Sequence, residues 1–310
     1  PIFGAILGAC YGPVAFLWIT IGGIFMGAMH DYLSGVILVR NQGLSITEIV
    51  ARYLGKGAGA FMRVFSVILL LLVGVVFVVS PADILSTKFD ILSKSWWLGI
   101  IIVYYFIATV LPVDKIIGKI YPLFGAALII MALSMLGLLI FGDYTIPELV
   151  SLDNMHFNAK SLPIVPTLFI SIACGAISGF HATQSPLMAR CVTNESQTRP
   201  IFFGAMISES IIALIWAAIA MAFFGGIEQL NDYMQAHNSN AGVVVSLICD
   251  TTLGRVGSIL ALLGVVIAPI TSGDTAFRSA RLIIADMLHY DQKPIYKRLI
   301  VSLPLFAIGI

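Results

Sequence analysis

The chain has 310 residues, of which 59% are hydrophobic and only 11% are charged, and its formal net charge is +1. Soluble domains carry roughly 25% charged residues, so the composition leaves little room for a soluble globular protein. The net charge argues neither for nor against an ionic partner. Apolar runs at 64–79, 123–141 and 201–224 approach the ~20 residues that a spanning helix requires. We therefore predict an all-α, polytopic membrane protein whose surface contacts lipid.

Hydropathy and the positions of Gly and Pro predict a short lead-in at 1–10, followed by a series of spans. The spans cover residues 13–39, 58–80, 96–111, 122–141, 163–180, 200–224, 255–269 and 299 onward. The seventh span either ends at 269 or continues to 288 after a break. Residues 45–54 open with the capping-box pattern Ser45-x-x-Glu48, which predicts a short surface helix, and the polar loop 142–162 could hold another. The chain starts without Met and stops inside an apolar run, so we expect truncation at both ends.

The basic residues are unevenly divided between alternate loops. Thirteen of the 17 Lys and Arg residues fall on one side of the expected topology. They are Arg40, Arg52, Lys56, Arg63, Lys115, Lys119, Arg190, Arg199, Arg278, Arg281, Lys293, Lys297 and Arg298. The positive-inside rule predicts that this side is cytoplasmic.

Two stretches interrupt apolar runs with Gly, Pro and polar side chains. They are 174–186 (CGAISGFHATQSP) and 268–275 (APITSGDT). Irregular backbone at membrane depth is tolerated only where protein or trapped water satisfies its N–H and C=O groups, and transporters use such breaks to bind substrates and ions. The alternative is a proline kink that packs against neighbouring helices and binds nothing.

The layout around the first break repeats an earlier part of the chain. A short segment interrupted by Gly and Pro precedes the long span at 13–39, and another precedes the long span at 200–224. These two long spans run in opposite directions in the expected topology, and five spans separate the two starts if a break before Pro1 is counted. This layout is typical of an inverted repeat of five helices each. Within a single transmembrane domain over 1–310, the first repeat covers about 1–142 and the second about 163–310.

Several stretches, which together span most of the chain, resemble the carbon starvation protein A (CstA) family. They are GAMHDYLSG (27–35), PVDKIIGKIYPLFGAAL (112–128), SGFHATQSPLMARC (178–191), RPIFFGAMISESIIALIWAA (199–218) and GDTAFRSARLIIAD (273–286). The resemblance implies multi-pass carriers of the bacterial or archaeal inner membrane, related to the amino acid–polyamine–organocation superfamily. It implies a leucine-transporter-like, five-plus-five inverted repeat with discontinuous helices. It also implies proton-driven symport of pyruvate or peptides during carbon starvation.

A carrier of this kind is not an enzyme, and it needs no nucleic acid and no cofactor besides H⁺ or Na⁺ as the coupling ion. A substrate carboxylate, from pyruvate or a di- or tripeptide, would bind main-chain N–H groups at a half-helix N-terminus. The candidate substrate-binding residues are Gly179, His181, Thr183, Gln184 and Ser185. His181 could titrate during transport, or it could stay neutral and bond to a freed carbonyl.

Proton coupling requires a titratable group deep in the membrane, where an ionisable side chain costs roughly 2.5–3.5 kcal/mol. Glu209 lies ~13 Å into its span at 1.5 Å per residue, although it could instead hydrogen-bond to a neighbouring helix. Asp274, flanked by Ser272 and Thr275, could bind a proton or cation. Asp274 could also merely cap a helix that resumes at Thr275 and pair with Arg278.

His30 and Asp31 close the first long span, ~26 Å of helix from residue 13. We expect them to form a gate or a structural clamp with Arg40, and we assign Arg278 to the same gate or structural group. Two other classes of function stay open: a passive channel, and a membrane sensor or enzyme that uses His30, Asp31 and His181. The sequence contains neither a pore motif nor an HExxH spacing, and its four Cys residues have no metal-ligand spacing.

Overall fold

The computed structural model describes residues 2–89, 91–110, 114–173, 185–186, 188–288, 290–292 and 294–308. Throughout these ranges, all regular secondary structure is helical. Their internal contacts divide the chain into two units. Unit 1 comprises Pro1–Leu44 with Ile129–Gly257, and unit 2 comprises Ser45–Leu128 with Ser258–Ile310.

Among the described residues, five helices are long and apolar enough to cross a membrane: Val14–Arg40, Lys56–Lys88, Pro122–Phe141, Glu195–Phe223 and Ala241–Met287. Shorter apolar helices cover Lys94–Val110 and Ile164–Ala173. These helices follow the first seven expected spans in order, and they expose large apolar side chains that lipid solvates and water does not. The prediction of an all-α, multi-pass membrane protein is confirmed.

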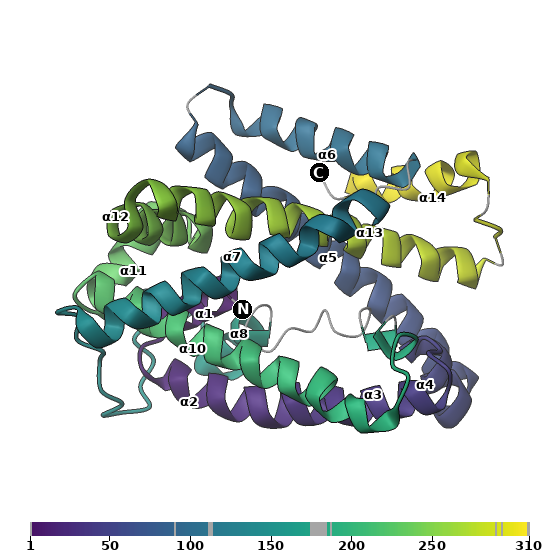
Figure 1. The fold of residues 1–310 in the computed structure, drawn as a ribbon, viewed down its shortest axis with the longest axis horizontal. Helices are drawn as coiled ribbons and strands as arrows, with labels where there is room; N and C mark the ends of the chain where they lie inside the picture. The colour runs from purple at the N-terminus through teal and green to yellow at the C-terminus, as the bar shows by residue number, and fades with distance from the viewer. Residues whose placement is uncertain are drawn as a thin grey trace. The chain divides into compact units, whose positions relative to one another are not determined.

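Unit 1 is organised around one long span that packs against another. Its elements are α1 Ile2–Ala9, α2 Val14–Ile21, η1 Gly22–Met29, α3 His30–Arg40, the end of α7 Asp114–Phe141, η2 Ile164–Leu168, α8 Phe169–Ala173, η3 Glu195–Gln197, η4 Arg199–Gly204, α10 Ala205–Phe223, α11 Ile227–Ala236 and most of α12 Ala241–Ala261. The elements α2, η1 and α3 join end to end and run alongside η4 and α10 (Figure 1).

Small residues explain why these two spans lie so close. The buried residues of η1 are Gly22, Gly23, Gly27 and Ala28. Its large apolar side chains point outward, and Met26 is 71% exposed. A Cβ atom on Gly23 would collide with Ser210 Oγ of α10, and one on Gly35 would collide with the ring of Phe202. Small residues let helix backbones approach in a membrane, while the bulky ones face lipid.

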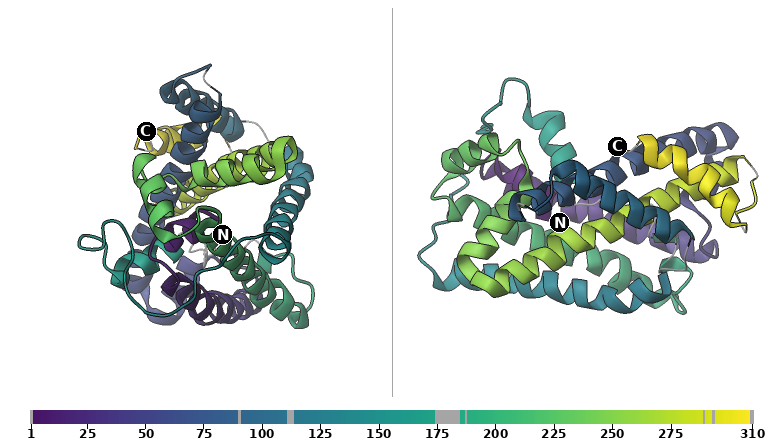
Figure 2. Two further views of the ribbon diagram at one scale, coloured as in Figure 1. Left: turned by 90° about the vertical axis from the view of Figure 1, so that its left-hand side faces the viewer. Right: turned by 90° about the horizontal axis from the view of Figure 1, so that it is seen from above.

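Unit 2 consists of α4 Ile46–Leu54, α5 Lys56–Lys88, α6 Lys94–Val110, the first part of α7, η5 Leu262–Ile267, α13 Ala268–Met287 and α14 Ile295–Ile308. Helix α13 packs along α5, and α14 lies beside α6 (Figure 2, right). The predicted capping box of α4 is confirmed: Ser45 Oγ accepts the Glu48 N–H at 3.2 Å, and the Glu48 carboxylate accepts the Ser45 N–H at 2.7 Å.

The predicted break at 268–275 is wrong. The helix continues from η5 through α13, and the irregular backbone lies earlier, at Gly254, where φ is 57° and ψ is −135°. Pro269 falls in the first turn of α13, directly after the wider turns of η5, where a proline is tolerated. The hydroxyls of Thr271 and Thr275 donate to Ala268 O and Thr271 O within the helix, so they do not interrupt it.

The region between the long spans of unit 1 also differs from expectation. Residues 142–163 contain no helix, contrary to the small surface helix considered for this loop. The stretch after α10, expected as a loop, instead contains α11, whose Leu230, Asn231 and Met234 are buried. The amide of Asn231 donates to Cys10 O at 3.1 Å and to Met155 O at 2.8 Å. Helix α11 and the 142–163 loop are therefore both fastened to the turn between α1 and α2.

Candidate functional site

Most of the predicted substrate-binding segment lies outside the described residues. This applies to Gly179, His181, Thr183 and Gln184. Ser185 is described: it is helical, and only 3% of its surface is exposed. Because the stretch between α8 and Ser185 is not described, the predicted break there, and its role in binding, stay predictions.

Glu209 lies in α10, half-buried, next to Ser210, whose hydroxyl occupies the space where a Cβ on Gly23 would lie. The hydroxyls on either side do not serve it as donors, because Ser208 Oγ bonds to Gly204 O and Ser210 Oγ bonds to Met206 O, each at 2.9 Å. The adjoining η1 and η4 are π-helical, and such wide turns often mark functional sites. Glu209 is thus an ionisable side chain within the apolar span Glu195–Phe223.

Asp274 is the most deeply buried of the predicted coupling residues, with 6% of its surface exposed. Arg278 Nη2 lies 2.6 Å from Asp274 Oδ2, one helical turn away, so the expected ion pair forms. The expected N-cap does not, because Asp274 lies inside α13 and Thr275 continues that helix. Ser272 and Thr275, assigned with Asp274 to ion coupling, are half-buried neighbours on the same helix. This pairing places Arg278 beside the carboxylate rather than at a separate gate.

Arg281, 7% exposed, follows Arg278 by three residues on α13. Residues three and four apart share a helix face, so this face carries a carboxylate and two guanidinium groups inside unit 2. In an apolar span such groups are costly and rarely lack a task. The sequence pattern alone did not single out Arg281, because it counts simply as one of the basic residues of the cytoplasmic side.

Tyr105 was also missed. It lies on α6, is fully buried, and packs its ring against Phe277 of α13 at 5.6 Å between centroids. A Cβ atom on Gly273 would collide with Tyr105 Oη, so this hydroxyl lies directly over the residue that precedes Asp274. No signal in the sequence could have found this contact, since 168 residues separate Tyr105 from Gly273 and tyrosine is common in spans.

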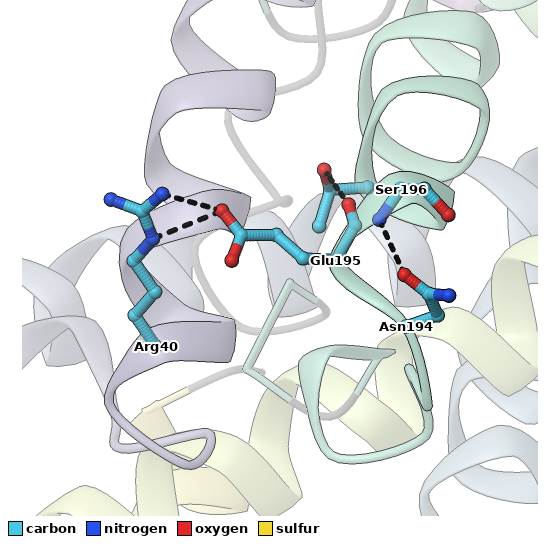
Figure 3. A network of polar contacts seen from close by, with 5 residues as sticks. Arg40, Asn194, Glu195 and Ser196 are labelled. Atoms are coloured by element: carbon cyan, nitrogen blue, oxygen red, sulfur yellow. Dashed lines mark hydrogen bonds and ion pairs between the residues drawn. The ribbon is translucent and has the colours of Figure 1, made fainter.

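His30 and Asp31 lie at the junction of η1 and α3. His30 Nδ1 is 3.3 Å from Asp31 Oδ1; the His30 side chain is 65% exposed and that of Asp31 only 6%. The expected clamp between this pair and Arg40 is wrong. Arg40 instead reaches Glu195 of η3, with Nη2 at 2.6 Å and Nε at 3.0 Å from Oε1 (Figure 3).

The same end of unit 1 carries a second tie. Arg190 Nε donates to Gly43 O at 3.0 Å, and Gly43, with φ of 72°, leaves room for the Arg190 side chain. Both ties join the end of α3 to the segment between Ser185 and η4, which directly follows the predicted substrate-binding segment. Glu195 thus takes the place beside Arg40 that the sequence assigned to His30 and Asp31, and the Arg190–Gly43 contact was not predicted.

Comparison with known proteins identifies a family and several relatives of this chain. The sequence profile of the family described as carbon starvation protein CstA matches residues 1–87 and 78–253. An uncharacterized membrane protein of Haemophilus influenzae is 42% identical over 286 residues, which cover 76% of this chain and 77% of that protein. No solved structure matches significantly.

Other relatives carry functional names. The peptide transporter CstA of Campylobacter jejuni is 26% identical over 293 residues, covering 73% of this chain and 41% of that protein. The peptide transporter CstA of Escherichia coli is 25% identical over 287 residues, covering 69% of this chain and 40% of that protein. The chain therefore spans well under half the length of these two transporters. The match of the family profile to more than half of the sequence shows that the chain belongs to the CstA family.

Proposed function

We propose that this protein is a secondary active transporter that takes up short peptides, or pyruvate, with protons as the driving ion. The named relatives in its family are peptide transporters, which supports peptides as the first substrate class to test. The observation that carries the proposal is the buried carboxylate of Asp274, held by Arg278 within an apolar helix. A carrier needs such a group, because it must bind and release the driving ion away from bulk water.

The division of the chain into units supports the proposed inverted repeat. In that repeat, α1 and the span α2–α3 are the first two members of one half, and the spans that begin at η2 and η4 are the first two of the other. All four lie in unit 1. The third and fourth members of each half, α5 with α6 and α13 with α14, all lie in unit 2. Unit 1 thus contains the first and second helices of both halves, and unit 2 contains the third and fourth. This distribution is expected if the two halves are structurally equivalent.

Within this proposal, Asp274 and Glu209 are the two candidate proton carriers, one in each unit. Ser272 and Thr275 would support a bound proton or sodium ion beside Asp274. The substrate would bind at Gly179, His181, Thr183, Gln184 and Ser185. His30 and Asp31 keep a gate or structural role at the end of unit 1 that carries the Arg40–Glu195 contact, and Arg278 has a structural role as the partner of Asp274.

Uptake by the complete protein in proteoliposomes tests the proposal. We expect a labelled tripeptide, and separately labelled pyruvate, to accumulate when an inward proton gradient is imposed. Asp274→Asn or Glu209→Gln should abolish accumulation but leave counterflow exchange, which needs no gradient. Ser208→Ala is the control, since Ser208 is exposed and bonds only to its own helix. Accumulation that ignores the proton gradient in the intact protein would rule the proposal out.

A further inference from the structure

The Tyr105 hydroxyl is a buried polar group without a hydrogen-bond partner in the described part of the chain. Tyr105 is 0% exposed, and its ring lies among Tyr104, Phe277 and Phe306, with centroids 5.6, 5.6 and 6.2 Å away. A buried hydroxyl normally finds a partner, because leaving one unpaired is unfavourable. The Tyr105 hydroxyl therefore keeps a free donor for any acceptor that comes within reach.

The backbone of α13 brings that hydroxyl to Asp274. A Cβ on Gly273 would collide with Tyr105 Oη and lie 3.0 Å from Tyr105 Cζ and 3.1 Å from Phe77 Cβ. Only glycine therefore leaves room for the hydroxyl at this point of the helix. The next residue is Asp274, which is buried like Tyr105 and follows directly on the glycine that the hydroxyl overlies.

Few other charged or titratable groups face this point. The stretch of α5 opposite, 70–78, is apolar, and so is η5; the stretch of α14 that carries Phe306, 300–308, has no ionisable residue. Helix α6 contributes Tyr104 and Tyr105, and α13 itself contributes Asp274, Arg278 and Arg281. A carboxylate is the strongest acceptor in this set, so it is the natural partner for the unpaired hydroxyl.

We propose that Tyr105 is a positioning residue for Asp274: its hydroxyl donates to the Asp274 carboxylate when Arg278 releases that carboxylate during transport. In the structure Arg278 pairs with the Asp274 carboxylate, and the Tyr105 hydroxyl has no hydrogen-bond partner among the described residues. The exchange replaces one donor with another, so the carboxylate never faces apolar surroundings alone. Tyr105 keeps its own proton throughout, and the transported proton binds to Asp274. This inference rests on the proposed role of Asp274 in proton coupling.

The test is the pH profile of tripeptide uptake by the complete protein carrying Tyr105→Phe, which keeps the ring and removes the hydroxyl. We expect uptake to persist and its half-maximal pH to rise by about one unit, because a carboxylate that loses a donor holds its proton to higher pH. Tyr104→Phe is the matched control, the same change on the adjacent residue, and it should leave the profile unchanged. A wild-type profile in Tyr105→Phe overturns the inference, as does a lower melting temperature without a shift.

Asp274→Asn separates this inference from the proposed function. If this variant still accumulates peptide under a proton gradient, Asp274 is not the coupling residue and the role of Tyr105 fails with it, while proton-driven transport itself stands with Glu209 as its remaining candidate carrier. If it loses accumulation but keeps counterflow, while Tyr105→Phe behaves as wild type, only the role of Tyr105 fails. Complete loss of counterflow in Tyr105→Phe at an unchanged melting temperature also contradicts the inference, since a positioning residue shifts transport and does not abolish it.

Discussion

The two ends of the span α2–η1–α3 are fastened to the rest of unit 1 in different ways. The start of the span, next to Tyr11 and Gly12, is held by buried contacts: Tyr11 is 1% exposed and Asn231 is 4% exposed. The far end, ~40 Å away at 1.5 Å per residue, is held by the Arg40–Glu195 pair, whose side chains are 66% and 49% exposed. We call the first contact set the Tyr11 end and the second the Arg40 end.

The difference matters because solvent weakens ion pairs. Water and salt screen an exposed pair, whereas a buried amide that loses its partners leaves them unsatisfied. The Arg40–Glu195 pair can therefore separate at little cost, while the buried contacts of the Tyr11 end resist separation. From the distribution of basic residues we expect the Arg40 end to face the cytoplasm, the side on which the proposed carrier would open to release its substrate.

Asn231→Ala should have the largest effect on the Tyr11 end. The change leaves Cys10 O and Met155 O without their shared donor, and we expect a loss of about 3 kcal/mol in the free energy of unfolding. Thermal unfolding in detergent measures it. Gln235→Ala on the exposed face of α11 is the matched control and should change little. Equal stability of the two variants would show that the Tyr11 end is not held by Asn231.

Gly12→Ala should weaken the same end somewhat less. Gly12 has φ of 88°, which side chains disfavour, and a Cβ there would lie 2.7 Å from Met155 Sδ. We expect a loss of about 2 kcal/mol, the sum of backbone strain and displacement of a flexible side chain. Gly99→Ala, in an open helical position, should instead stabilise the protein, so opposite shifts of the melting temperature are the expected result. Shifts of the same sign would contradict it.

The Tyr11 end should also loosen as the pH falls. The ring of His156 packs against that of Tyr11 in a tilted arrangement with centroids 4.7 Å apart, and its Nδ1 accepts the Asn158 N–H at 3.0 Å. Burial lowers the pKa of His156 below its usual value of 6.5. The unfolded chain then binds the proton more readily, so stability falls as the pH drops from about 6.5 toward the folded pKa. Melting temperatures measured between pH 8 and 5 should show this decline, and His156→Phe should reduce it. An unchanged decline in that variant would assign the effect to other groups.

The smallest effect on stability is expected at the Arg40 end. Glu195→Gln removes an exposed pair, so the melting temperature should not change measurably. Hydrogen exchange of the main chain in 194–198 should nevertheless become faster, because η3 loses its tie to α3. Glu228→Gln, exposed on α11, is the control and should leave that exchange unaffected. A large drop in melting temperature for Glu195→Gln would show that the Arg40 end contributes as much to stability as the Tyr11 end, contrary to this expectation.

Local features of the fold could be predicted from the sequence because local energies decide them. Apolar length predicts the spans, since the bilayer sets the cost of exposing backbone. The Ser45–Glu48 pattern predicts the start of α4, and the four-residue spacing of Asp274 and Arg278 predicts their ion pair. Residue matches along the chain also indicated the CstA family.

The chain's continuity at 268–275 and its long-range contacts were decided only by the tertiary structure. Thr271 and Thr275 can break a helix or bond back into it, and the sequence does not distinguish the two. Likewise, Tyr105 meets Gly273 and Arg40 meets Glu195 across long stretches of chain. Such contacts depend on how whole helices pack, which is a sum over many weak interactions that no local pattern records.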